Sequence, residues 1–101
     1  RVGLDIEKIQ SKIIQIGPRF AHPEELLRLG DSNTARHYTK LWCGKEAMYK
    51  WSNIEGLSFK NELPILCSDS NAWYGKSTRI SNDLISLEMI EFDNHILCFT
   101  N

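Results

Sequence analysis

Two short stretches of the chain carry charged residues at spacings that suggest a common site. Residues 3–7 read Gly-Leu-Asp-Ile-Glu, and residues 42–50 read Trp-Cys-Gly-Lys-Glu-Ala-Met-Tyr-Lys. Because side chains alternate along a strand, Asp5 and Glu7 would point to the same face, about 6–7 Å apart along the chain. Two carboxylates at this separation repel each other unless a cation or a donor lies between them. Magnesium, which prefers oxygen ligands and substrate phosphates, is the obvious cation.

The second stretch would place a third carboxylate, Glu46, beside two lysines on a helix. Lys50 follows Glu46 by four residues on the same helical face, whereas Lys45 is rotated by about 100° and approaches from the side. Transfer at a pyrophosphate depends mainly on positioning and charge neutralisation. A metal ion with lysines is therefore a sufficient set of groups, and no Cys or Ser nucleophile is required.

Each of these charges has a simpler explanation when taken singly. Asp5 and Glu7 fit the solvated face of an edge strand, and Glu46 with Lys50 fits an ordinary ion pair on a helix surface. The combination of both stretches is more specific than either part, and it favours a site. Trp42 is expected in the core, because it follows helical spacing with the apolar residues Tyr38, Leu41 and Met48.

Both stretches resemble the signatures of the phosphopantetheinyl transferase superfamily, Gly-x-Asp-x-Glu and Trp-x-x-Lys-Glu-Ala-x-x-Lys, in this order and at about this separation. The resemblance looks closer to the Sfp-type branch than to the small trimeric holo-acyl-carrier-protein synthases, because Glu7 follows Asp5 by two residues. It extends from Val2 to about Phe59 and fades beyond.

This resemblance implies a defined reaction and a role for each charged residue. The family transfers the phosphopantetheine arm of coenzyme A to a serine of an apo acyl or peptidyl carrier protein, in fatty-acid, polyketide or nonribosomal peptide biosynthesis. By analogy, Asp5, Glu7 and Glu46 would bind Mg²⁺, and Lys45 and Lys50 would contact the phosphates of coenzyme A. Glu46, or a water that it orients, would accept the proton of the serine, with Lys50 beside it in the catalytic group.

The chain also departs from the family pattern. An Sfp-type enzyme has two similar halves with the coenzyme between them, and this chain resembles only the second half. The Ser-x-Ser-His segment of the first half has no counterpart here, and residues 77–81 lack the His that the trimeric branch carries after its Lys-Glu signature. We therefore expect residues 1–101 to form a single domain, a fragment of a two-half protein, in which self-association could replace the missing half.

Composition excludes several other classes of protein. The 101 residues are 42% hydrophobic and 25% charged, which is ordinary for one globular domain. A net charge of -1 gives no reason to expect nucleic acid or an acidic membrane as partner. No apolar run reaches the ~20 residues that span a bilayer, and no signal peptide is visible. Cys43, Cys67 and Cys98 are odd in number and widely spaced, which favours reduced thiols in a cytoplasmic protein.

The expected elements give an α+β fold: one strand, then helices, then antiparallel strands, as in the half-domain of this family. We predict a strand over 1–9, a helical turn over 11–16 that ends at Gly17-Pro18, and a helix from Pro23 to near Gly30. A longer helix should open after Asp31 or Ser32 and run to about Trp51. Strands are predicted at 57–59, 63–67, 73–74, 84–92 and 96–100, with a hairpin turn at 93–94.

Two other functions remain open at this level. A non-catalytic module that binds a carrier protein or coenzyme A would keep the same fold without turnover, although the presence of all five charged residues argues against it. A metal-dependent nuclease ranks last, because that class usually places its acid and lysine two residues apart on a strand.

Overall fold

The computed structural model describes residues 1–29, 34–68 and 72–100. One five-stranded antiparallel sheet, in the order β1-β5-β4-β3-β2, forms one layer of the molecule. The strands are β1 (Leu4–Lys8), β2 (Ile65–Ser68), β3 (Trp73–Gly75), β4 (Ile85–Phe92) and β5 (His95–Thr100). The helices are α1 (Ile13–Phe20), α2 (Pro23–Leu29), α3 (Ala35–Ser52) and α4 (Phe59–Glu62). The predicted α+β order is confirmed.

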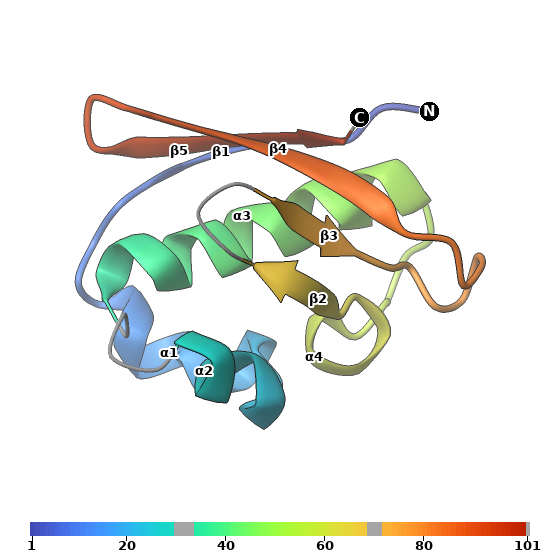
Figure 1. Cartoon of the computed structure of the whole chain (residues 1–101), viewed down its shortest axis with the longest axis horizontal. Helices are drawn as coiled ribbons and strands as arrows, with labels where there is room; N and C mark the ends of the chain where they lie inside the picture. Colours follow the sequence, from blue (N-terminus) through green and yellow to red (C-terminus); the bar gives the residue numbers. More distant parts are fainter. Residues whose placement is uncertain (30–33, 69–71, 101) are drawn as a thin grey trace.

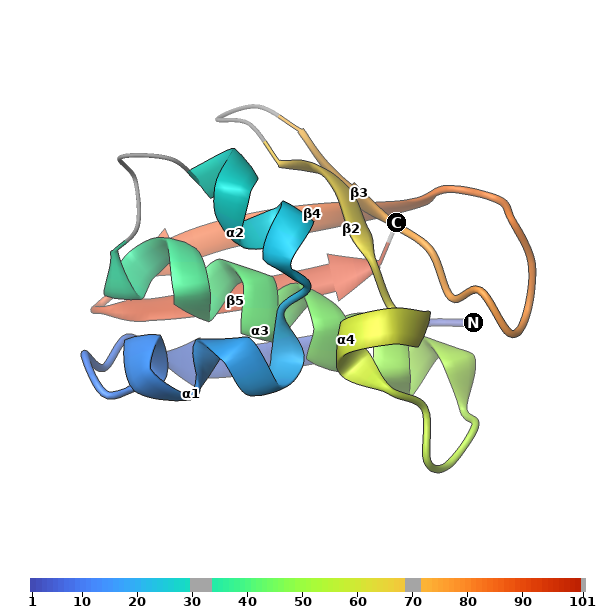
Figure 2. The same cartoon turned by 90° about the horizontal axis from the view of Figure 1, so that it is seen from below.

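Helix α3 lies against one face of the sheet, and the other helices lie on the same side as α3 (Figure 1). Seen from below, α1 runs beside α3, and α4 lies between α1 and β2 (Figure 2). The core fills the space between α3 and the sheet, where Leu41, Met48, Ile65 and Ile96 are almost fully buried. Gly44 belongs to this contact, since a Cβ there would lie 3.2 Å from Met89 Cε. Its nearest neighbours are therefore side chains of the sheet.

The last two strands form the hairpin that the sequence predicts. Asp93 and Asn94 connect β4 to β5 and have φ angles of 46° and 60°. A two-residue turn with both central residues in the left-handed region matches the twist of the flanking strands. Asn and Asp tolerate this conformation better than other residues with a side chain.

Two predictions of secondary structure are wrong. Residues 57–59 do not form a strand, because Ser58 caps the short helix α4, its hydroxyl accepting from the Asn61 N–H at 3.1 Å. Helix α1 continues through Gly17-Pro18 to Phe20, since Ile13, Gly17 and Phe20 form one buried face and Gly17 packs directly on the Tyr38 ring.

The N-terminal cap of α3 also differs from the prediction. Thr34 occupies the cap position, with its hydroxyl accepting from the His37 N–H at 3.4 Å. The two residues named from the sequence, Asp31 and Ser32, lie outside the described residues. The predicted end of the helix near Trp51 agrees with the last helical residue, Ser52.

Two further expectations concern thiols and membranes. Among the described side chains, Cys43 and Cys98 are free thiols, both fully buried. Burial raises the pKa of Cys98 to about 12, so this thiol stays protonated at neutral pH. Within the described residues, no helix combines the length and the hydropathy needed to cross a bilayer.

Candidate active site

The first strand and helix α3 meet at a point where only glycine fits. A Cβ on Gly3 would overlap the backbone carbonyl of Ala47 and lie 2.9 Å from Cβ of Trp51. Thr100 fixes this segment from the other side, because its hydroxyl accepts from the Gly3 N–H at 2.9 Å and its own N–H donates to the Gly3 carbonyl at 2.9 Å. The close approach places the acids of β1 beside the second half of α3.

Asp5 and Lys50 form the central contact of the site. Lys50 Nζ donates to Asp5 Oδ1 at 2.8 Å and to the carbonyl oxygen of Leu4 at 3.1 Å. Asp5 is 6% exposed, whereas the Lys50 side chain is 49% exposed. The hydrogen bond to Asp5 raises the pKa of Lys50, so the ammonium remains charged at neutral pH. The pair therefore joins a buried carboxylate to a solvent-accessible cation.

Glu7 and Glu46 lie close enough to Asp5 to change each other's ionisation. Partial burial, then the neighbouring Asp5 carboxylate, then the charge of Glu46 raise the pKa of Glu7 to about 7. Burial and Asp5 likewise raise the pKa of Glu46, with Lys50 opposing the shift. One lysine thus faces three carboxylates, and negative charge exceeds positive charge at this point.

The site does not form a ready set of metal ligands. Within the part of the chain that the structure describes, no group of three His, Cys, Asp or Glu side chains is arranged to hold a metal ion. One observation nevertheless fits a cation: Asp5 Oδ2 is buried and has no hydrogen-bond partner. A buried carboxylate oxygen without a donor is costly, and a hard cation would satisfy it. The acids fit magnesium in donor type and charge, and the predicted metal site stays a prediction.

Lys45 is not brought to this group. Its side chain is fully buried, and its ammonium contacts Glu25 at 2.9 Å and the carbonyl oxygens of Phe59 and Leu63 at 2.6 Å and 3.0 Å. Although adjacent in sequence to Glu46, Lys45 faces the opposite way, toward α2 and α4. Its predicted contact with phosphate has no support from this geometry.

Trp42 has a role that the sequence did not reveal. Its side chain is only half-buried, and its polar interaction with Glu7 lowers the pKa of that acid, in opposition to burial and to Asp5. The prediction that Trp42 lies in the core holds only in part: Tyr38, Leu41 and Met48 are buried, whereas Trp42 packs against the core from its edge. The position of Trp42 four residues before Glu46 was a possible signal, since both side chains then lie on one helical face.

Two neighbouring cavities share Ile16 and Trp42, and Glu7 lines the first of them. The first, of about 360 Å³, is lined by Glu7, Lys8, Gln10, Lys12, Ile13, Ile16 and Trp42. The second, of about 400 Å³, is lined mostly by the apolar side chains Ile16, Phe20, Trp42 and Phe59, with Arg19 and Ser58 beside them. The Trp42 ring contacts the Phe20 ring edge-on at 5.1 Å and stacks on Phe59 at 5.2 Å. Together the cavities lead from a carboxylate to an apolar surface.

Comparisons with known proteins agree with this fold. The family model described as "4'-phosphopantetheinyl transferase superfamily" matches residues 1–98. The comparison with curated protein sequences gives no significant match.

Three solved structures share the fold along almost their whole length. The holo-[acyl-carrier-protein] synthase of Helicobacter pylori, in complex with coenzyme A, has a TM-score of 0.77 and 19% identity, over 99% of this chain and 97% of that chain. The corresponding Neisseria meningitidis synthase has a TM-score of 0.75 and 22% identity, over 98% and 94%. The Plasmodium yoelii synthase has a TM-score of 0.71 and 20% identity, over 98% and 90%. The closer resemblance to the Sfp-type branch gains no support from these comparisons.

Proposed function

Because the chain belongs to the 4'-phosphopantetheinyl transferase superfamily, we propose that it transfers 4'-phosphopantetheine from coenzyme A to a serine of an apo acyl or peptidyl carrier protein, with Mg²⁺. The observation that carries this proposal is the convergence of Asp5, Glu7, Glu46 and Lys50 at the contact between β1 and α3. A fold neighbour that binds coenzyme A supports the choice of co-substrate.

Asp5, Glu7 and Glu46 are the residues that would hold magnesium. A divalent cation would satisfy the orphaned oxygen of Asp5, and it would offset the repulsion between neighbouring carboxylates, which after burial is the second cause that raises the pKa of Glu7 and Glu46. When bound, magnesium supplies charge neutralisation to the pyrophosphate of coenzyme A. Trp42, which lines the same cavity as Glu7 and lowers the pKa of that acid, would favour its ionised, metal-binding form.

Lys50 and Glu46 carry the remaining roles. In the transfer, the serine oxygen attacks the phosphorus nearer the pantetheine, and the bond from that phosphorus to adenosine 3',5'-bisphosphate breaks. Lys50 reaches solvent, from where its ammonium would contact a phosphate oxygen of coenzyme A. Glu46 accepts the serine proton, and its raised pKa makes its ionised form a stronger base than an ordinary carboxylate.

The apolar cavity beside Trp42 is the proposed binding place of the pantetheine arm. The arm is a flexible, largely uncharged chain attached directly to the reacting phosphate, so it must leave the acids along the protein surface. The path from Glu7 past Ile16 to Phe59 begins at a metal-binding acid and becomes apolar. Arg19 and Ser58 supply polar groups beside this apolar surface.

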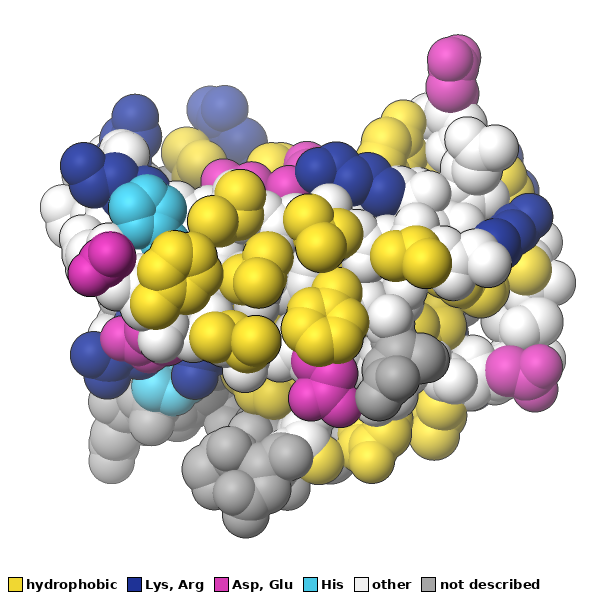
Figure 3. All heavy atoms as spheres, turned by 90° about the horizontal axis from the view of Figure 1, so that it is seen from above, with side chains coloured by type: hydrophobic (Ala, Val, Ile, Leu, Met, Phe, Trp, Pro, Cys, Tyr) yellow, Lys and Arg dark blue, Asp and Glu magenta, His cyan; other side chains and the backbone are white. Residues whose placement is uncertain are grey.

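The side of the sheet opposite α3 supports self-association. Apolar side chains gather on this face over β1, β5 and β4 (Figure 3). Ile6, Leu97 and Ile90 are paired across the three strands, and Ile6 and Ile90 are 49% and 47% exposed. Leu4 and Phe92 extend the same face. A second copy packed here would bury this apolar patch and would stand in the place of the half that the resemblance to two-half enzymes leaves missing.

One experiment tests the proposed function against a non-catalytic binding module. The full-length protein is incubated with coenzyme A, magnesium and an apo carrier protein, and the carrier is weighed by mass spectrometry. We expect the mass of the phosphopantetheine arm to be added by the wild type and by the control Glu91→Gln, a surface acid paired with Arg36. Asp5→Asn and Glu46→Gln should abolish the addition, and equal labelling by these variants would reject the proposed roles. Binding of coenzyme A without any labelling would favour the binding module.

A further inference from the structure

The ammonium of Lys45 makes every hydrogen bond that it can make. Its three N–H groups match three acceptors: Glu25 Oε1, the Phe59 carbonyl and the Leu63 carbonyl. Phe59 is the first residue of α4, and Leu63 follows its last residue. One buried side chain of α3 therefore holds both ends of α4.

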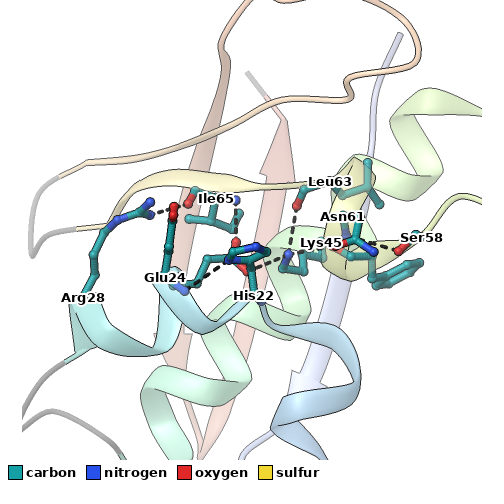
Figure 4. Close-up of polar contacts among 10 residues, drawn as sticks. His22, Glu24, Arg28, Lys45, Ser58, Asn61, Leu63 and Ile65 are labelled. Atoms are coloured by element: carbon teal, nitrogen blue, oxygen red, sulfur yellow. Dashed lines mark hydrogen bonds and ion pairs between the residues drawn. The ribbon is translucent and has the colours of Figure 1, made fainter.

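Glu25 completes the arrangement from α2. Its Oε1 accepts from the His22 N–H at 2.7 Å as well as from Lys45, and its Oε2 accepts from the Ile65 N–H at 2.6 Å. The residue is 3% exposed. Figure 4 shows the Lys45 ammonium directed toward the segment that carries Leu63, with His22 close by. The ion pair thus joins α2, α3, α4 and the start of β2 at one point.

The consequence for the candidate site passes through Phe59. Its ring stacks on Trp42 at 5.2 Å and lies 5.1 Å from the Tyr49 ring. Phe59 also lines the apolar cavity that we assign to the pantetheine arm. Whatever fixes the backbone of Phe59 fixes that wall of the cavity.

We propose that Lys45 and Glu25 act as positioning residues that hold Phe59 in the wall of the arm-binding cavity, and that Lys45 does not bind phosphate. This inference rests on the proposed function for its effect on coenzyme A. A phosphate-binding role would require the Lys45 ammonium to leave its buried position. The Glu25 carboxylate and two carbonyl groups would then each lose a donor inside the protein, which is strongly unfavourable.

Binding measurements with two ligands distinguish a positioning role of Lys45 from a phosphate-binding role. Coenzyme A carries the arm, whereas adenosine 3',5'-bisphosphate carries phosphates and no arm. We expect Glu25→Gln and Lys45→Met to weaken binding of coenzyme A about tenfold, the scale of one lost aromatic contact, and to weaken binding of the bisphosphate less than about twofold, measured by titration calorimetry on the full-length protein with magnesium. The control Arg36→Gln removes an exposed charge from the same helix, whose partner is Glu91, and should change neither affinity.

A different pattern would overturn the proposal. If Lys45→Met weakened both ligands equally while Glu25→Gln weakened neither, Lys45 would be a phosphate ligand. Glu25→Gln keeps the size and one carbonyl oxygen of the side chain, so it serves as the decisive variant if Lys45→Met does not fold. In a Phe59→Ala background, Glu25→Gln should add no further loss of affinity for coenzyme A, because both changes act on the same wall.

A structural readout keeps the inference independent of activity. Nuclear Overhauser contacts between the rings of Trp42 and Phe59 should be present in the wild type and in Arg36→Gln, and lost or weakened in Glu25→Gln. Their retention in both pair variants would overturn the proposal. If the wild type binds neither ligand, the proposed function fails, and these ring contacts still decide whether the pair positions Phe59.

Discussion

Gly3 lies directly on the carbonyl group of Ala47, and no side chain fits between β1 and α3 at this point. Ala47 is fully buried and follows Glu46, while Gly3 precedes Asp5 by two residues. The contact therefore sets the distance between the acids of the strand and the acid of the helix. Gly3 in the first stretch and Ala47 in the second are small because the two backbones approach closely at this point.

The first prediction concerns this contact. Gly3→Ala should destabilise the protein by about 1–3 kcal/mol, the usual cost of forcing a methyl group into a well-packed site. It should also lower phosphopantetheine transfer, because β1 must move away from Glu46. Thermal unfolding and the mass-spectrometric assay measure the two effects.

Gly44→Ala is the matched control for Gly3→Ala. The atoms nearest to its new Cβ would be the ends of the flexible side chains of Met89, Leu87 and Ile65, at 3.2–3.4 Å. Alanine also favours the helix by about 1 kcal/mol over glycine. We expect a small change in stability and retained transfer; a loss of transfer as large as that of Gly3→Ala would show that the Gly3 contact is not special.

The second prediction follows from the contact between Lys50 and Asp5. Lys50 already neutralises part of the charge that magnesium would bind, since it donates to Asp5 Oδ1 at 2.8 Å. Lys50→Met should therefore bind magnesium more tightly than the wild type in the absence of coenzyme A, as measured by calorimetry. Transfer should nevertheless fall by roughly 10²-fold, the usual loss when one preorganised donor to a reacting phosphate is removed.

Weaker magnesium binding in Lys50→Met would contradict a competition between the two cations for Asp5. The matched control is Lys12→Met, which removes an exposed cation that lines the neighbouring cavity near Glu7. It should leave the affinity for magnesium unchanged within error.

The third prediction is a pH dependence of stability that arises from Glu7. Its pKa rises from the ordinary value of 4.5 to about 7 in the folded protein. Between these values the folded state keeps a proton that the unfolded state has lost, so the free energy of unfolding should fall as the pH rises from 4.5 to 7 and change little from this source above 7. The raised pKa of Glu46 acts in the same direction.

Denaturant titrations between pH 4.5 and 8 measure this dependence. Glu7→Gln has no proton to lose and should flatten the curve. Magnesium should restore stability at pH 8 in the wild type and not in Asp5→Asn, because the cation binds the ionised acids. A wild-type protein that becomes steadily more stable from pH 5 to 7 would contradict the assigned shift.

Much of the fold followed from local patterns. The alternation of Leu4, Asp5, Ile6 and Glu7 predicts a strand with its acids on one face, and Asp93-Asn94 predicts the hairpin, because these signals depend on near neighbours in sequence. The wrong prediction of a strand at 57–59 also has a local cause. The apolar residues Leu57 and Phe59 favoured a strand, whereas Ser58, Asn61 and Glu62 form the cap of a short helix.

The environment of Lys45 could not be predicted in the same way. Helical spacing places Lys45 to one side of Glu46, yet it does not say which element covers that side. The answer lies in Glu25, twenty residues earlier, and in two carbonyl groups of a short helix. A charged residue in a catalytic signature is readily assigned a catalytic role. Only the tertiary structure shows that Lys45 is buried and fully hydrogen-bonded.

The last prediction concerns the apolar face of the sheet. Ile6 on β1 lies at one end of a cross-strand row with Leu97 and Ile90, and it is 49% exposed although apolar. If a second copy covers this face, Ile6→Glu should place a charge in the interface and leave the core untouched, because the side chain points away from α3. We expect sedimentation analysis to show dissociation to monomers and the transfer assay to show a loss of activity. Leu27→Glu is the control, since Leu27 on α2 is 78% exposed and lies off the sheet. An unchanged assembly state in Ile6→Glu, or a monomeric wild type that is fully active, would contradict a role for this face in completing the site.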